Sequence, residues 1–478
     1  MKERNRVEST KKFNSTAIVA VLVASAFIAT FNETILNVAL SNIMKDMNVT
    51  AGTVQWLITA YMIVTSVMVP VTAFLIQTFK TKELFFGALG LLLLGTICVA
   101  FSRSFGILVI SRMIQASGTG MMIPIMMNTV LLVAPKEKIG SAMAICVSAI
   151  ALGPAFGPTV SGIILQYFDW HILFIILVPI IILIMIIGNS VLVNVGEITK
   201  PKIDYLSIVL STIGLGAIIY GISSISSSSL KVTLVSFVVG IICVIIFVKR
   251  QFNLEEPMLN LTPFKYPKFV IGVLLVMISM MIIFTMNVML PMLMERALGT
   301  TSFVAALALL PAIILNGIAT PIGGKIYDKY SVKWLVPIGV GIIALFVFVL
   351  AHISSETSLI SIIITYIFVC IGVGFTMSPC QTHSLNQLPK EYYPHGVAIV
   401  NTFQQVSAAI GASLFMGIMS AVQVKAMEVN QVTEQVAVAK GFTSAAMVAF
   451  FIVIIGLVLS FIFGKGENKQ KLNAKEVL

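Results

Sequence analysis

The sequence predicts an all-α polytopic membrane protein. Of its 478 residues, 58% are hydrophobic and only 10% are charged, and the mean hydropathy is +1.04. Soluble globular domains do not have this composition. Because one helical crossing needs about 20 apolar residues, the chain has room for many crossings and little else. The distribution of apolar segments and of basic residues then defines the individual elements.

Fourteen apolar segments are expected to cross the membrane as helices. The first six segments lie near residues 14–40, 51–76, 84–102, 105–133, 139–166 and 171–194. Two more lie near 205–225 and 232–248, and the last six near 269–294, 302–323, 334–352, 358–388, 395–423 and 441–463. Their length and apolar character are those of membrane helices.

The basic residues predict the orientation of these helices. Short cytoplasmic loops carry an excess of Lys and Arg in polytopic membrane proteins. With a cytoplasmic N-terminus, most of the 30 basic residues fall on the inner side. The outer loops hold only Lys45, Arg103, Lys231, Arg296, Lys425 and Lys440. Both termini are therefore expected in the cytoplasm, and the net charge of +11 is attributed to topology and not to nucleic-acid binding.

Two similar inner loops predict an internal repeat. Residues 75–82 follow the second segment and residues 326–333 follow the tenth, and many transporters consist of two related bundles. If the loops are equivalent, segments seven and eight are an inserted pair. The expected organisation is an N-terminal tail, a six-helix bundle, an inserted two-helix segment, a second six-helix bundle and a C-terminal tail, at residues 1–13, 14–200, 201–252, 253–463 and 464–478.

Two ionisable residues lie inside expected spans. Glu33 falls late in the first span and Arg112 early in the fourth, each roughly 10 Å below the outer edge at about 1.5 Å per residue. Charges in hydrocarbon are costly and are usually kept for a pathway, a relay or a partner. Burial and a nearby arginine act in opposite directions on the proton affinity of a carboxylate, so this pair could load and release a proton. The alternative is a static ion pair that holds the two helices together.

A run with two Gly-Pro pairs lies inside the fifth segment. The run consists of Gly153, Pro154, Gly157, Pro158 and Gly162. Its prolines lack an amide donor, and its glycines let a neighbouring backbone approach closely. The pattern is typical of a kinked helix packed tightly against another helix. It predicts a hinge in a transporter, with a merely bent packing helix as the alternative.

Three motifs resemble a known family. The Gly-Pro run resembles the antiporter motif of drug exporters in the major facilitator superfamily, and residues 111–120 resemble that family's motif in span four, whose arginine is associated with proton transfer. Residues 32–40 are similar to the first-span motif of the fourteen-helix drug:proton antiporters (EmrB/QacA type, including lincomycin-resistance-like exporters), which usually carry Asp where this chain has Glu33. The resemblance implies the major facilitator fold and places Arg112 and Glu33 in proton coupling.

The resemblance also implies a conformational latch in the loops after spans two and ten. The family pattern is kept by Gly324, Asp328, Lys329 and Lys333 in the second loop. In the first loop, Gln77 occupies the position of the acidic residue. The stronger latch is therefore expected at Asp328, and the basic residues of the first loop are explained by the positive-inside rule.

Polar residues in spans whose counterparts line the central cavity of that family are candidates for substrate contact. They are Asn37, Gln55, Tyr61, Gln115, Asn128, Asn287 and Gln404. Interhelical hydrogen bonding is the alternative explanation for each of them. The 25 methionines and 30 phenylalanines would give such a cavity adaptable apolar walls.

The function expected from these observations is proton-coupled export of lipophilic or amphiphilic compounds, with lincosamides as candidate substrates, across a bacterial cytoplasmic membrane. Its partners would be these small molecules, protons and membrane lipid, with no nucleic acid, cofactor, metal or obligatory protein partner. The first alternative is a dedicated exporter of an endogenous metabolite or signalling molecule. A membrane-embedded enzyme is a remote alternative, because the sequence has no His-Glu-x-x-His motif, nucleotide-binding glycine loop or sizeable soluble domain.

Overall fold

The computed structural model describes residues 14–49, 51–54, 56–195, 198, 204–223, 230–254, 257–330, 332–428 and 432–465. Within these ranges all regular structure is helical. The expected N-terminal tail and nearly all of the expected C-terminal tail lie outside the described residues. The all-helical fold predicted from composition is confirmed.

The first half of the chain forms nine α-helices before the segment near residue 200. They are α1 (Ser15–Ile35), α2 (Leu40–Asp46), α3 (Ala51–Val54), α4 (Trp56–Thr78), α5 (Thr81–Ala100), α6 (Phe105–Val133), α7 (Ile139–Ile164), α8 (Trp170–Ile175) and α9 (Leu177–Val191). Then come α10 (Tyr205–Ser223) and α11 (Leu230–Asn253). The remaining long helices are α12 (Pro267–Arg296), α13 (Ser302–Lys329), α14 (Val332–Leu350), α15 (Leu359–Asn386), α16 (Tyr393–Glu428) and α17 (Glu434–Phe463).

Twelve helical stretches among the described residues are long and apolar enough to cross a membrane, with α8 and α9 counted as one stretch. The predicted count of fourteen is not confirmed. In α10 the apolar stretch covers Tyr205–Gly221, about 26 Å at 1.5 Å per residue and thus shorter than a hydrocarbon core of about 30 Å. In α16 the polar residues Asn401, Gln404 and Gln405 lower the hydropathy of an otherwise long helix.

Local sequence explains where several of these helices begin. The side chains of Asn14, Ser104, Thr301 and Ser358 each accept a hydrogen bond from the backbone N–H three residues later. Such N-caps satisfy amide donors that have no partner within the helix. The ends predicted for the segment at residues 105–133 coincide with those of α6, since a serine cap precedes it and Ala134 takes an extended conformation after it.

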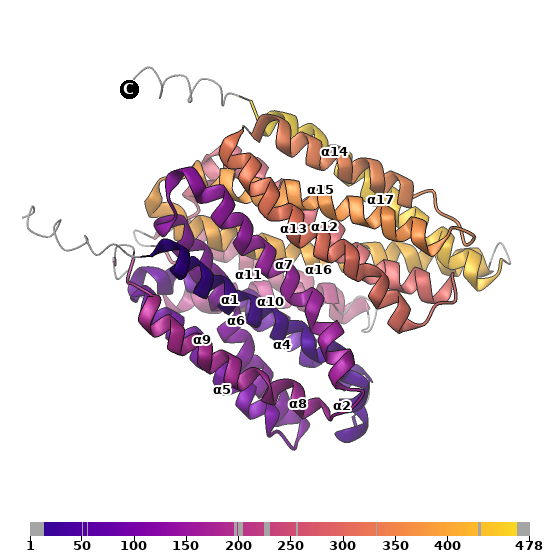
Figure 1. The fold of residues 1–478 in the computed structure, drawn as a ribbon, viewed down its shortest axis with the longest axis horizontal. Helices are drawn as coiled ribbons and strands as arrows, with labels where there is room; N and C mark the ends of the chain where they lie inside the picture. The colour runs from indigo at the N-terminus through magenta and orange to yellow at the C-terminus, as the bar shows by residue number, and fades with distance from the viewer. Residues whose placement is uncertain are drawn as a thin grey trace, which may run out of the picture.

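The helices form two groups that pack against each other along their length. Figure 1 shows α1 and α4–α9, in indigo to magenta, on one side and α12–α17, in orange to yellow, on the other. The groups meet where α7 packs on α13 and where α4 packs on α16, and α10 lies between α4 and α11 while also contacting α16. Apolar side chains remain exposed on the outer helices, as on α11, α14 and α17, which suits contact with lipid.

Candidate functional site

Arg112 lies at the end of α1, fully buried within the first group of helices. Its Nη1 donates to the backbone oxygen and to Oδ1 of Asn32, at 3.1 and 2.9 Å, and its Nη2 donates to the backbone oxygen of Glu33 at 3.1 Å. The last four carbonyls of an α-helix lack intrahelical partners, and α1 ends at Ile35. The guanidinium therefore caps the C-terminus of α1, where a positive charge is also favoured by the helix dipole.

A ring of polar side chains completes the environment of this arginine. Gln115, one turn further along α6, accepts from Arg112 Nη1 at 2.9 Å and donates to Thr96 Oγ1 on α5 at 2.9 Å. Asn32 Nδ2 donates to the same Thr96 oxygen at 3.3 Å. Gly95 leaves the space for Gln115, because a Cβ at position 95 would lie 2.5 Å from Gln115 Cγ. The network thus ties together α1, α5 and α6.

Tyr61 of α4 covers the open face of the guanidinium. The Arg112 Cζ atom lies 4.1 Å from the centre of the Tyr61 ring, a distance suited to a cation–π interaction. The Tyr61 hydroxyl forms a 2.6 Å hydrogen bond with Thr119 of α6. Tyr61 and Gln115, both expected to line a substrate cavity, are thus buried next to Arg112.

Glu33 is close to Arg112 but does not form an ion pair with it. The ion pairs among the described residues join Lys80 with Glu83 and Arg250 with Asp204. Arg112 uses the backbone carbonyl of Glu33, and the Glu33 side chain is partly exposed while Arg112 is fully buried. The static ion pair considered as an alternative is therefore not the arrangement in this structure.

The Gly-Pro run of α7 forms a close crossing with α1. A Cβ at Gly153 would overlap the Thr30 hydroxyl, and a Cβ at Gly157 would overlap the Thr34 hydroxyl. Pro158 has no amide N–H, so the carbonyl of Pro154 lacks its usual helical donor. Thr34 Oγ1 instead donates to this carbonyl at 3.3 Å.

Gly162, the last glycine of the run, behaves differently. A Cβ at this position would meet no atom within 4 Å. The position therefore takes no part in the close crossing with α1. The side chain of Pro158 lies outside the part of the chain for which side chains are described.

Asp328 joins the two groups of helices at the end of α13. Its Oδ1 accepts from Gly140 N at 2.7 Å, and its Oδ2 accepts from Ser141 N at 2.8 Å and from the Ser141 hydroxyl. Gly140 and Ser141 are in the first turn of α7, where unpaired amides and the helix dipole favour an anion. Gly324 permits this approach, since a Cβ there would lie 2.5 Å from the Gly140 carbonyl oxygen.

The other residues of the expected latch have more local contacts. The ammonium groups of Lys329 and Lys333 lie 5.3 and 5.6 Å from the ring centres of Tyr330 and Trp334, respectively. Gln77, in the corresponding loop after α4, donates within its own helix to the Ala73 carbonyl at 2.9 Å. The two loops thus differ in the way the sequence suggests. Asp328 in the second loop contacts another helix through its carboxylate, whereas Gln77 in the first loop bonds within its own helix.

The remaining cavity candidates do not form one cluster with Arg112. Asn287 of α12 accepts a 2.9 Å hydrogen bond from Tyr366 of α15. Asn128 of α6 and Gln404 of α16 are buried, and Asn128 Oδ1 and Gln404 Nε2 have no hydrogen-bond partner among the described residues. Gln55 lies outside the described residues, and so does the side chain of Asn37.

Sequence reasoning missed two members of the Arg112 network. Asn32 belongs to the first-span motif but was not singled out, and Thr96 is one threonine within an apolar segment. The Gly95-Thr96 pair was the signal in the sequence, because the glycine lets another helix approach closely and the next residue offers that helix a hydroxyl group. Together, the network, the glycine crossing of α1 and α7 and the carboxylate contact between α13 and α7 are the candidate functional site.

Comparisons with known proteins agree with these motifs. Residues 22–412 match the Major Facilitator Superfamily. The lincomycin resistance protein LmrB of Bacillus subtilis is 40% identical over 463 residues, which cover 95% of this chain and 97% of that protein. LmrB of Listeria monocytogenes is 39% identical over 463 residues, with 96% and 98% covered.

A solved structure supports the fold independently. The proton:xylose symporter XylE matches with a TM-score of 0.65 at 14% identity, covering 94% of each chain. The resemblance first suggested by the three motifs is therefore confirmed. The chain belongs to the Major Facilitator Superfamily.

Proposed function

We propose that the protein is a proton-coupled exporter of lipophilic or amphiphilic compounds that works by alternating access. The observation that carries the proposal is the buried Arg112 network. Its guanidinium binds the last turn of α1, the turn that carries Glu33. The similarity to lincomycin resistance proteins over nearly the whole chain supports drug export and suggests lincosamides among the substrates. Bacterial cytoplasmic membrane is the matching location.

In this mechanism Glu33 binds and releases the proton. Its carboxylate lies within a membrane helix, where the charged form is costly, next to a guanidinium that favours the charged form. Because Arg112 is held by carbonyl and amide oxygens, it keeps hydrogen-bond partners in both protonation states of Glu33. Protonation then removes the negative charge at the end of α1, while the two Nη groups of the guanidinium keep their hydrogen bonds.

Coupling also requires two conformations with different affinities for proton and substrate. The close crossing of α1 and α7 at Gly153 and Gly157 allows a change at Glu33 to reach α7 directly. At the opposite end of α7, Asp328 binds Gly140 and Ser141 and thereby stabilises the state in which α7 and α13 are joined. We assign the latch to this carboxylate.

The proposed architecture has fourteen spans with both termini in the cytoplasm. It takes α10 and α16 as crossing helices in addition to the twelve long apolar stretches, and divides the chain into two six-helix bundles with α10 and α11 as the inserted pair. Asn128 and Gln404 support a polar contact surface for substrate, because each has a buried polar atom that finds no partner in the part of the chain that the structure describes.

The test is transport by purified protein in proteoliposomes with an imposed pH gradient. Uptake of lincomycin and of a fluorescent lipophilic cation is compared for the parent protein, Glu33→Gln and Glu33→Asp. Proton-driven transport that a protonophore abolishes, that Glu33→Gln loses and that Glu33→Asp keeps supports the proposal. Drug transport unchanged in Glu33→Gln would move the coupling site elsewhere. A well-folded parent protein that moves neither compound would favour a dedicated metabolite exporter.

A further inference from the structure

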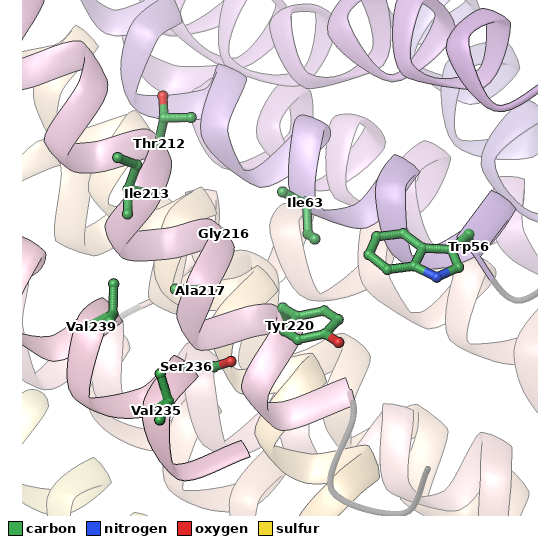
Figure 2. Close-up of a pocket in the computed structure, with 10 residues that line it drawn as sticks. All are labelled: Trp56, Ile63, Thr212, Ile213, Gly216, Ala217, Tyr220, Val235, Ser236 and Val239. Carbon is green, nitrogen blue, oxygen red and sulfur yellow. The ribbon is translucent and has the colours of Figure 1, made fainter. Parts of the chain in front are cut away.

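An open apolar groove of about 410 Å³ lies between α4, α10 and α11, away from the residues discussed above. We call it the α4/α10 groove. Its lining includes Trp56 and Ile63 of α4, Gly216, Ala217 and Tyr220 of α10, and Val239 of α11 (Figure 2). The described residues that line it include no charged side chain, and its hydroxyl groups come from Thr212, Tyr220 and Ser236.

The groove follows from one missing side chain and one aromatic pair. A Cβ at Gly216 would lie 3.2 Å from Ile63 Cγ2, so the glycine lets α10 approach α4 and leaves a hollow beside the contact. At one end the rings of Trp56 and Tyr220 stack with their centres 5.8 Å apart (Figure 2). On the other side Val235 and Val239 of α11 remain exposed. The result is a concave apolar surface where a single helix would be convex.

The length of the groove corresponds to one leaflet of a membrane. From Thr212 to Tyr220 the groove extends about 12 Å along α10 at 1.5 Å per residue, close to half of a hydrocarbon core of about 30 Å. Trp56 and Tyr220 mark the end nearest the connection between α10 and α11. Tryptophan and tyrosine are enriched at this level, between hydrocarbon and headgroups.

A basic residue lies beyond the aromatic end. Lys231 precedes Val235 by one turn of α11, so both residues are on the same face of that helix. Lys231 is exposed and belongs to no ion pair among the described residues. These features match the chemistry of a phospholipid with an anionic headgroup. The apolar groove is one leaflet long, amphipathic aromatic rings lie at its end, and the Lys231 ammonium lies beyond the rings.

We propose that the α4/α10 groove binds one anionic phospholipid, with an acyl chain in the slot and the phosphate near Lys231. In the orientation proposed above, the lipid belongs to the outer leaflet. The lipid would fill the space between α4, which belongs to the first group of helices, and α10, which also contacts α16 of the second group. Its binding is independent of whether the protein exports drugs.

Fluorescence of the few tryptophans provides the test, since the chain has only three. Trp170 is buried and serves as a constant background, while Trp56 and Trp334 are exposed on the protein surface. Trp334→Phe leaves Trp56 as the exposed reporter, and Trp56→Phe leaves Trp334 as its matched control. Both proteins are reconstituted with chain-brominated phosphatidylglycerol, which quenches tryptophan on contact, and are then diluted into detergent without brominated lipid.

Trp56 should stay quenched after dilution, while the fluorescence of Trp334 recovers. Ala217→Phe, added to the Trp334→Phe protein, fills the groove and should abolish the residual quenching, whereas Val458→Phe on the exposed face of α17 should not. Lys231→Ala should weaken retention of phosphatidylglycerol about fivefold, the effect expected for one basic residue at an anionic lipid surface.

The proposal is overturned if Trp56 and Trp334 recover to the same extent, or if Ala217→Phe leaves the residual quenching unchanged in a protein that elutes as a single folded species. It is also overturned if excess lincomycin restores Trp56 fluorescence and unlabelled phosphatidylglycerol does not. That result would assign the groove to a transported compound.

Discussion

Replacing Gly153 by alanine should destabilise the crossing of α1 and α7. The added Cβ would lie 2.9 Å from Phe31 N and 2.9 Å from Thr30 Cβ, and it would overlap the Thr30 hydroxyl. Thr30 has little freedom to move away, because its hydroxyl donates to the carbonyls of Ala26 and Phe27 at 3.0 and 3.1 Å. The helices must therefore separate by about 0.5–1 Å to bring the contacts with Phe31 N and Thr30 Cβ to a normal distance of about 3.5–4 Å, and by more to relieve the overlap with the Thr30 hydroxyl.

The size of the effect follows from two opposing terms. Overpacking of this kind costs about 1–3 kcal/mol, while replacement of a helical glycine by alanine gains about 0.5–1 kcal/mol in the absence of steric conflict. Gly153→Ala should thus lose up to about 2.5 kcal/mol of stability, with a midpoint of about 1 kcal/mol. Gly162→Ala, in the same motif and helix, should gain about 0.5–1 kcal/mol because its Cβ meets no atom within 4 Å.

Thermal unfolding of the purified proteins in one detergent measures this difference, and proteoliposome transport measures its consequence. The expected order of Tm is Gly162→Ala above parent above Gly153→Ala, with reduced transport only for Gly153→Ala. Equal Tm and equal transport for the two alanine variants would refute the reasoning, because it would mean that α1 and α7 do not depend on the close approach at Gly153.

Three further predictions concern charged groups. Asp328→Asn weakens charge-assisted hydrogen bonds worth about 1.5–3 kcal/mol. Spin labels at the adjoining ends of α7 and α13 should therefore show a longer distance between the two helix ends. Glu356→Gln makes an equal charge change on an exposed loop and should leave that distance unchanged. Arg112→Lys replaces the forked guanidinium by one compact ammonium group, which should leave buried acceptors unpaired at a cost of about 1–3 kcal/mol each. Both Tm and transport should fall, and a Tm equal to that of the parent protein would contradict this. Arg250 holds the pKa of Asp204, just before α10, down at about 2 by hydrogen bonding, and this stabilisation is present above about pH 4 and lost as the pH falls toward about 2. The Tm deficit of Asp204→Asn should therefore shrink over that range, and a deficit independent of pH would contradict the assignment.

The helices and the position of the site were largely predictable from sequence. Apolar length fixes a membrane helix within a few residues, as in α6, where the expected and observed ends agree. The difference between Gln77 and Asp328 was also visible, because a carboxylate has two acceptor oxygens and a negative charge that suit the amides at the start of another helix.

Side-chain partners were less predictable. Sequence depth placed Glu33 and Arg112 at one level and favoured a proton-loading pair, with a static ion pair as the alternative. The arginine binds backbone carbonyls that are free to accept only because α1 ends at Ile35. The end of a helix inside an apolar segment has no hydropathy signal. Gln115, a cavity candidate for which an interhelical hydrogen bond was the alternative, is bonded to Arg112 and to Thr96 of a third helix.

The contact of Arg112 with a main-chain oxygen at position 33 has a consequence for sequence change. The first-span motif that residues 32–40 resemble has Asp at this position, and a change from Asp to the longer Glu would disturb a direct carboxylate–guanidinium pair. Every amino acid has the same backbone carbonyl, so Arg112 keeps its hydrogen bond to position 33 whether that residue is Asp or Glu. The chain can thereby vary the reach of its acidic side chain while the neighbouring cation stays in place.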